Sequence, residues 1–313
     1  MTRKIRAALA PCSLGAWPTP LERAPALAQA VGASGLWLKR EDRSAPRGGG
    51  NKVRGLEFLL AGAAPGTVFV TVGGAGSTHC LATAVHAAAC GCRAVVAQFP
   101  QPETDASRAV ARACAAHAAG VVRARARATL PLAAFAAWRR AARLGPARWI
   151  PAGGAHPRAV AGHIAAALEL AGQCPPPEPP DAIVAPLGTG GTAAGLLLGV
   201  AALGWPTRVV GVRVAPALVA NGWRTARLAR ATRRLLACHG LALPAPRSLM
   251  IVDGLGRGYG RPTAAGEAAR ALAAAHGLAL DPTYGAKAFA ALAPLAAGGY
   301  RRLVFWHTFA FPR

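Results

Sequence analysis

The chain has 313 residues, a formal net charge of +24 at pH 7, 53% hydrophobic residues and 15% charged residues. This composition indicates a globular protein with room for two domains and excludes an intrinsically disordered chain. Every apolar run is shorter than the roughly 18 residues that cross a membrane, and the seven cysteines lack zinc-site and CxxC spacing, so we expect a cytoplasmic protein with reduced thiols, no membrane segment and no metal.

Short runs rich in valine and isoleucine alternate with alanine-rich helical segments along the chain. The expected strands are 36–41, 67–73, 93–99, 120–124, 148–153, 182–188, 208–214, 250–254 and 302–308. The expected helices include 51–62, 77–90, 104–119, 156–173, 191–203, 263–276 and 284–297. This alternation predicts an α/β protein with parallel sheets covered by helices on both faces, and the number of strands favours two sheets over one.

Two segments are expected to lie outside this pattern. The N-terminal MTRKIRAALAPCSLGAW begins like a secretory signal, but its apolar stretch is short and is broken by Pro11, so we do not interpret it as one. The segment QCPPPEPPD (173–181) predicts a surface loop, because proline removes the backbone donor that a helix needs.

The segment GGGNKVRGLEFLL (48–60) leads from three glycines into Asn51 and Lys52 at the start of a helix. Lys52 is one of only four lysines, so the other 32 of the 36 basic residues are arginines. Arginine stays protonated and cannot form an imine, whereas a lysine with a lowered pKa can. Taken alone, Lys52 could also be a solvated lysine in a first helical turn.

The segment VAPLGTGGTAAGLLLG (184–199) predicts a strand, a turn and a helix. Its turn residues could hold one phosphate group through backbone N–H groups and the helix N-terminus. These residues are Gly188, Thr189, Gly190, Gly191 and Thr192. The spacing matches neither GxGxxG nor a P-loop, and a plain tight turn is an equal alternative. An imine-forming lysine and a site for one phosphate are together what pyridoxal phosphate requires.

Five segments then carry a specific resemblance: LWLKREDRSAPRGGGNKVRGLEFLL, TVGGAGSTHCLATAVHAAACG, PLGTGGTAAGLLLG, LDPTYGAKAFAAL and LVFWHTFA. In this order they resemble the D-cysteine desulfhydrase and 1-aminocyclopropane-1-carboxylate deaminase family, over about residues 15–310. The family has fold type II of the pyridoxal-phosphate enzymes, similar to the tryptophan synthase β-subunit. The resemblance implies two open, twisted, mainly parallel sheets flanked by helices, and a homodimer. It also implies a large domain from 1–47 with 161–313 and a smaller inserted domain, 48–160.

The resemblance assigns roles to residues near the first two glycine-rich segments. Lys52 resembles the Schiff-base lysine, which also moves the α-proton, and Asn51 the residue that positions the cofactor. Ser77, Thr78 and His79 resemble the loop that binds the substrate carboxylate and borders the cofactor. The family has asparagine where this chain has Thr78, and His79 could instead be a core histidine.

Residues near the C-terminus bear on the reaction. Tyr284 resembles the tyrosine beside the cofactor ring and, with Lys52 and Ser77, is a candidate catalytic residue, although it could simply pack at a helix start. Tyr259 resembles a second pocket tyrosine. Thr308 matches the threonine that binds the pyridine nitrogen in the desulfhydrase branch. The cyclopropane deaminase branch has an apolar residue there and a glutamate after the ring tyrosine, where this chain has Gly285. A hydroxyl leaves the ring nitrogen largely unprotonated, which favours β-elimination over ring opening.

Three departures from the family surround the expected cofactor. Gly55 replaces a lysine near the phosphate, with Arg54 as the candidate substitute, and Phe309 and Ala310 replace a glycine pair. Thr78 is the third. We therefore expect a pyridoxal-phosphate lyase that converts a small amino acid, D-cysteine or another β-substituted alanine, to a 2-oxo acid and ammonia. The alternatives are 1-aminocyclopropane-1-carboxylate ring opening and a diverged cofactor-binding protein with little catalysis.

The net positive charge raises nucleic-acid binding as an alternative of another class. The densest basic segments are RARARA (123–128) and RTARLARATRRLL (224–236), the second of which predicts an amphipathic helix with a basic outer face. The other arginines are scattered, and no helix-turn-helix, zinc finger or aromatic-basic pattern accompanies them. A compositional bias toward arginine and alanine explains the charge as well, so we do not expect a nucleic-acid partner.

Overall fold

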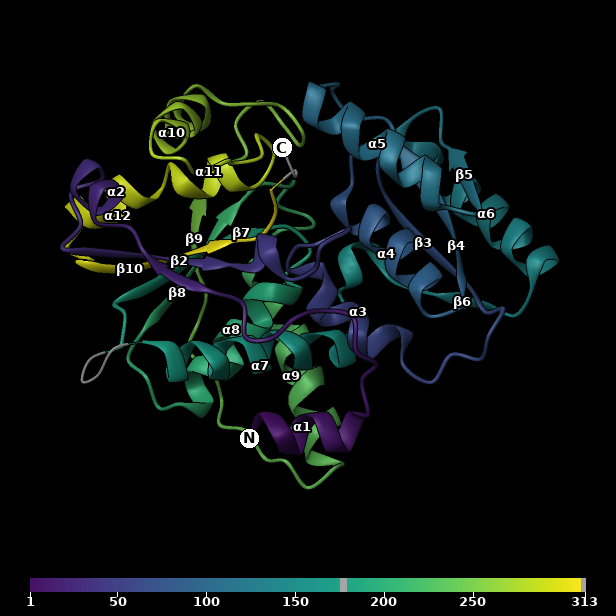
Figure 1. The fold of residues 1–313 in the computed structure, drawn as a ribbon, viewed down its shortest axis with the longest axis horizontal. Helices are drawn as coiled ribbons and strands as arrows, with labels where there is room; N and C mark the ends of the chain where they lie inside the picture. Colours follow the sequence, from purple (N-terminus) through teal and green to yellow (C-terminus); the bar gives the residue numbers. More distant parts are fainter. Residues whose placement is uncertain (175–178, 311–313) are drawn as a thin grey trace.

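The computed structural model describes residues 1–174 and 179–310, which form two β-sheets flanked by helices (Figure 1). The larger sheet has the strand order β1-β2-β10-β7-β8-β9, and its neighbouring strands are parallel except for the antiparallel pair β1–β2. Its strands are β1 (Leu21–Arg23), β2 (Gly35–Arg40), β7 (Ala182–Leu187), β8 (Arg208–Arg213), β9 (Met250–Asp253) and β10 (Arg302–His307). The central strands β7 and β10 are continuous apolar runs because helices cover both of their faces.

The smaller sheet is entirely parallel and has the order β5-β4-β3-β6. Its strands are β3 (Val68–Gly74), β4 (Arg93–Phe99), β5 (Gly120–Arg123) and β6 (Ala147–Trp149). Helix α6 (Leu130–Leu144) packs its alanines on one face of this sheet. Helices α4 (Thr78–Ala89) and α5 (Asp105–His117) cover the other face, where Cys80 and Cys114 are buried.

The larger sheet also lies between two layers of helices (Figure 1). One layer contains α2 (Pro25–Ala30), α10 (Ala264–Ala275), α11 (Gly285–Phe289) and α12 (Leu292–Ala297). The other layer contains α7 (Pro157–Gln173) and α8 (Gly191–Ala202), with α9 (Gly222–Ala237) and α1 (Thr2–Leu9) packed outside them. Helix α3 (Lys52–Leu60) packs against α7 and α4 and so joins the two halves. Three short 3₁₀ helices complete the described elements: η1 (Glu41–Arg43), η2 (Arg127–Thr129) and η3 (Ala152–Gly154).

This architecture confirms the predicted α/β class with two sheets, and each expected strand and helix corresponds to an observed element. Two boundaries were wrong. The strand expected over 148–153 ends at Trp149, because Pro151 follows and Gly153 has a φ of 64°. The helix expected over 284–297 is divided into α11 and α12, because Pro294 has no N–H to donate to the carbonyl of Ala290.

The N-terminal segment belongs to the fold. Ile5 and Leu9 on one face of α1 are buried with Phe58, Val160 and other residues of α3 and α7. In the proline-rich segment, α7 ends at Gln173 and residues 175–178 lie outside the described part of the chain. All seven cysteines are free thiols. Among the described residues, no helix combines the length and the apolar character that crossing a membrane requires.

Candidate active site

One cavity of about 430 Å³ lies where strands of both sheets reach their carboxyl ends. Ligand sites of open α/β sheets occur at such ends, where loops meet helix N-termini. Every residue predicted for the site lines this cavity, except Arg54, which was expected near the phosphate. These residues are Asn51, Lys52, Ser77, Thr78, His79, Gly188, Thr189, Gly190, Gly191, Thr192, Tyr259, Tyr284 and Thr308.

Lys52 is the first residue of α3, and its side chain extends into the cavity. Its Nζ donates to the carbonyl oxygen of Gly153 at 3.3 Å. Burial disfavours the charged ammonium and lowers the pKa of Lys52 from 10.5 to about 8. A substantial fraction of this amine is therefore neutral near physiological pH, which is the form that attacks an aldehyde.

Asn51 connects three segments of the site. Its Nδ2 donates to Thr192 Oγ1 at 2.8 Å, and its backbone N–H donates to the carbonyl oxygen of Thr308 at 2.9 Å. The side chain is almost fully buried, so these bonds are shielded from competing water. Asn51 therefore fixes Lys52 relative to the glycine-rich turn and to the end of β10.

The glycine-rich turn follows β7 and leads directly into α8. Gly190 has a φ of 89°, and a Cβ there would lie 2.8 Å from Thr225 Oγ1 of α9. A Cβ on Gly188 would meet no atom within 4 Å, so the turn is open toward the cavity at this residue. Open space beside the N-terminus of a twelve-residue helix suits a phosphate group.

Ser77, Thr78 and His79 lie at the N-terminus of α4. Ser77 caps this helix, since its Oγ accepts the N–H of Cys80 at 3.3 Å. The N–H groups of Thr78 and His79 are in the first turn, where a helix leaves donors without intrahelical partners. Thr71 Oγ1 is 3.0 Å from His79 Nε2, and burial beside Lys52 lowers the pKa of His79 to about 3. His79 is thus neutral and buried, as expected of a core histidine, and it also lines the cavity, as expected of a residue in the substrate-binding loop.

The two tyrosines form a rigid wall of the cavity. Asp281 accepts the backbone N–H groups of Thr283, Tyr284 and Gly285 at 3.0, 2.7 and 2.8 Å and so fixes the start of α11. The hydroxyl groups of Tyr259 and Tyr284 share a hydrogen bond of 2.5 Å. Burial raises the pKa of Tyr259 to about 12 and that of Tyr284 well above 10, so both phenols stay neutral.

Thr308 follows β10 and is almost fully buried at the cavity wall, beside Phe309. Gly285 follows Tyr284 at the start of α11. No aspartate or glutamate is among the described residues that line the cavity. A cofactor ring here would therefore face a hydroxyl group and no carboxylate.

The prediction that Arg54 replaces the family's lysine near the phosphate is wrong. Its guanidinium donates to both carboxylate oxygens of Glu41 at 2.6 and 2.7 Å and to those of Glu169 at 3.0 and 2.9 Å. Arg54 is two residues after Lys52, about 200° around the helix, and so points away from the cavity. A Cβ on Gly55 would lie 3.0 Å from the Cβ of Ala159, so α7 occupies the place where a longer side chain would begin.

Among the lining residues that were not predicted from the sequence, three bear on the chemistry of the site. Gly153 accepts the Lys52 ammonium, Phe99 ends β4, and Arg127 begins η2. The arginine cluster 123–128 was noted only as surface charge, and no signal separated Arg127 from Arg125. The glycine pair 153–154 before the helix expected at 156 could have indicated a ligand loop.

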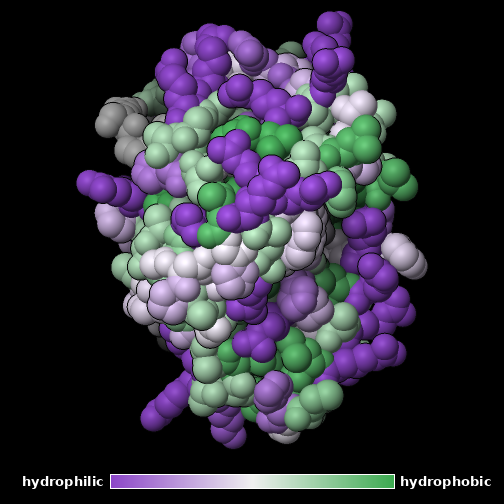
Figure 2. All heavy atoms as spheres, turned by 90° about the vertical axis from the view of Figure 1, so that its right-hand side faces the viewer, coloured by the Kyte–Doolittle hydropathy of each residue, from purple (hydrophilic) through white to green (hydrophobic). Residues whose placement is uncertain are grey.

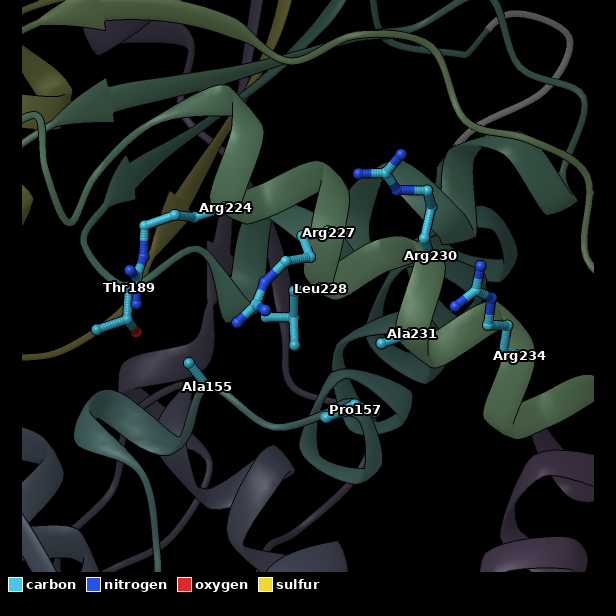
Figure 3. Close-up of a pocket in the computed structure, with 9 residues that line it drawn as sticks. All are labelled: Ala155, Pro157, Thr189, Arg224, Arg227, Leu228, Arg230, Ala231 and Arg234. Atoms are coloured by element: carbon cyan, nitrogen blue, oxygen red, sulfur yellow. The ribbon is translucent and has the colours of Figure 1, made fainter.

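A second cavity, of about 600 Å³, adjoins the glycine-rich turn, since Thr189 lines both cavities. Four arginines of α9 extend around it (Figure 3). They are Arg224, Arg227, Arg230 and Arg234. All four are exposed, which confirms the predicted basic outer face of this helix.

Comparison with known proteins agrees with this geometry. A family model described as "Pyridoxal-phosphate dependent enzyme" matches residues 12–308. The chain is 35% identical over 281 residues to nocardicin C-9′ epimerase of Nocardia uniformis, covering 87% of this chain and 85% of that protein. It is 31% identical over 294 residues to D-cysteine desulfhydrase of Salmonella schwarzengrund, covering 88% of this chain and 85% of that protein.

The fold is also similar to that of a solved structure, the crystal structure of an ACC deaminase homologue. The TM-score is 0.84 at 28% identity, with 99% of this chain and 95% of the other covered. These findings confirm the family resemblance, the fold type and pyridoxal phosphate as the cofactor. Since the family model spans nearly the whole chain and the predicted lysine lies in the common cavity, this protein belongs to the pyridoxal-phosphate-dependent enzymes.

Proposed function

We propose that this protein is a lyase that removes the α-proton and the β-substituent of a small amino acid and yields a 2-oxo acid and ammonia. The observation that carries this proposal is Thr308 in a cavity wall whose described residues include no carboxylate. A hydroxyl partner gives the cofactor ring no charge to hold a proton on its nitrogen. Weak electron withdrawal suits a reaction in which a good leaving group accepts the electrons as the α-proton departs.

The chain's own residues then take separate tasks. Lys52 holds the cofactor and, as a neutral amine, receives the α-proton at its Nζ. The N-terminus of α4 binds the substrate carboxylate through the N–H groups of Thr78 and His79, beside Ser77. The turn from Gly188 to Thr192 binds the phosphate, and Tyr284 packs beside the ring. When bound, the cofactor supplies the electron acceptor that makes the α-proton acidic.

Two other reactions share the α-proton step. Epimerisation returns the proton to the other face of Cα, and the similarity to an enzyme named nocardicin C-9′ epimerase favours it as a second candidate. The other reaction is opening of the cyclopropane ring of 1-aminocyclopropane-1-carboxylate (ACC), the substrate in the name of the similar structure. Gly285 and Thr308 do not favour it, because neither position carries a carboxylate. A carbon leaving group needs a stronger electron acceptor than a hydroxyl-bound ring provides.

The experiment is an assay with both enantiomers of β-chloroalanine, cysteine and serine, and with 1-aminocyclopropane-1-carboxylate, in D₂O. Elimination predicts release of 2-oxo acid, and epimerisation predicts deuterium at Cα of the recovered amino acid without such release. Lys52→Ala should abolish both reactions and the visible absorbance of the bound cofactor. Bound cofactor with neither reaction on any substrate would contradict the lyase assignment and favour a diverged binding protein.

We also propose the domain division, assembly and location expected from the sequence. Residues 48–160 include the whole smaller sheet, which supports a small domain inserted in a large one made of 1–47 and 161–313. Helix α6 presents Leu132 and Phe135 with 72% and 61% of their surface exposed, which supports a homodimer contact. Seven free thiols support a reducing compartment, the cytoplasm.

A further inference from the structure

The candidate active site contains a second cation that the proposed reaction does not use. Among the described residues that line the cavity, the lysine and arginine side chains are those of Lys52 and Arg127. Lys52 is committed to the cofactor and the α-proton. Arg127 therefore stands in this wall as a permanent positive charge that needs another explanation.

Aromatic rings hold the Arg127 guanidinium in place. Its Cζ lies 5.2 Å from the ring centroid of Phe99 and 5.7 Å from that of Tyr259. Tyr259 is in turn fixed by its hydrogen bond to Tyr284. Such contacts attract the cation and restrict its motion, so it loses less conformational freedom when it binds a ligand.

Arg127 has no carboxylate partner within the described part of the chain, and no acidic side chain lines the cavity there. This differs from Arg40 and Arg54, whose guanidinium groups are paired with carboxylates. A planar guanidinium fits a carboxylate or a phosphate with two parallel hydrogen bonds. An anion carried by the ligand would complete such a pair in the cavity.

The substrate's α-carboxylate already has a place at the N-terminus of α4. Arg127 comes from a different segment, η2 after β5, and its side chain is exposed, whereas Ser77 is buried. An anion at Arg127 thus belongs to a part of the substrate that extends from the reacting carbons toward solvent.

We propose that Arg127 selects β-substituted alanines whose substituent ends in a carboxylate or a similar anion. This inference rests on the proposed elimination. For O-succinylserine, the Cα–H and Cβ–O bonds break, and the electrons of the first form the Cα–Cβ double bond. Succinate leaves with the electrons of the second, and water converts the resulting enamine to pyruvate and ammonia.

The test compares O-succinylserine with O-acetylserine, whose leaving group is also a carboxylate but carries no second charge. Wild type should show the higher kcat/KM for O-succinylserine. Arg127→Gln should lower kcat/KM for O-succinylserine about tenfold, mainly through KM, and leave O-acetylserine within about twofold. Arg127→Lys should restore part of the loss. The control is Arg125→Gln, because Arg125 carries the same charge, lies two residues away, and is exposed outside the cavity. It should leave kcat/KM for both substrates unchanged.

Two results would overturn the inference while leaving elimination intact. One is turnover of β-chloroalanine by wild type without any preference for O-succinylserine over O-acetylserine. The other is an equal loss on both esters in Arg127→Gln, which would make Arg127 a structural contact or an α-carboxylate ligand. Failure of β-chloroalanine and of both esters in cofactor-loaded protein would instead defeat the proposed elimination, and this inference with it.

Discussion

If Lys52 binds the cofactor as proposed, its ionisation controls cofactor loading. Its pKa is lowered to about 8 by burial, so the reactive neutral amine is scarce below this pH. In cofactor-free protein, the rate of pyridoxal phosphate capture should rise about tenfold per pH unit below the pKa and level off above it. Stopped-flow absorbance over about pH 6 to 10 measures this rate. A rise that continues toward 10.5, the ordinary lysine value, would contradict the burial effect.

The same shift has a consequence for stability in the absence of cofactor. The folded protein holds the Lys52 proton less tightly than the unfolded chain, so the shift disfavours folding. This cost is fully present below the folded pKa of about 8 and is lost as the pH rises toward the unfolded value of 10.5.

Arginine at this position would keep its charge and could not capture the aldehyde.

Among the elements, the turn before α8 contains two glycines, Gly188 and Gly190, with different surroundings. A side chain on Gly188 would enter open cavity space, whereas one on Gly190 would collide with Thr225 and strain a φ of 89°. Gly188→Leu should therefore prevent cofactor retention in a folded protein, measured by absorbance and far-UV circular dichroism. Gly172→Leu is the matched control, because a Cβ there also meets nothing within 4 Å but lies outside the cavity. Full cofactor content in Gly188→Leu would place the phosphate elsewhere.

The two faces of helix α3 have different roles, since one carries Lys52 at the cavity and the other carries the ion-paired Arg54. Lys52 faces the cavity, while Arg54 is buried between Glu41 and Glu169 and over the ring of Trp17. Arg54→Met would leave the buried Glu41 carboxylate without an ion-pair partner, whereas Glu169 would keep Lys39. The substitution should lower the free energy of unfolding by about 3–5 kcal/mol. Urea denaturation measures this, with Arg108→Met, an exposed ion-paired arginine, as a control that should change little. Loss of cofactor affinity without loss of stability would restore the role at the phosphate that we first expected.

At the scale of the whole molecule, the sequence predicted the two-sheet fold and the residues that meet in the cavity. Parallel strands bring their carboxyl ends to one edge, and the family resemblance indicated which distant segments meet there, those of Lys52, Thr78, Gly188 and Thr308. Side-chain direction was harder to predict. The direction of Arg54 follows from its helical angle to Lys52, and that of Arg127 depends on the rings of Phe99, at the end of β4, and of Tyr259.

The surface of the molecule bears on its assembly. On the side formed by the smaller sheet and its helices, hydrophobic side chains reach the surface between hydrophilic ones (Figure 2). Leu132, Phe135 and Trp138 repeat every three residues along α6 and are all exposed. If they form the homodimer contact, Phe135→Glu should yield monomers in light scattering, and Trp223→Glu, an exposed aromatic of α9, should not. Monomeric wild-type protein would contradict the contact.

The proposed elimination depends most on a weakly electron-accepting cofactor ring, which is implied by Thr308 in a cavity wall whose described residues include no carboxylate. The most direct test is the ratio of two rates in wild-type protein, 2-oxo acid release from β-chloroalanine and from 1-aminocyclopropane-1-carboxylate. The account predicts that chloride elimination is faster by at least about 100-fold, which corresponds to roughly 2.7 kcal/mol in the barrier. Equal rates would contradict it, because a ring that opens a cyclopropane as readily as it releases chloride cannot be a weak acceptor.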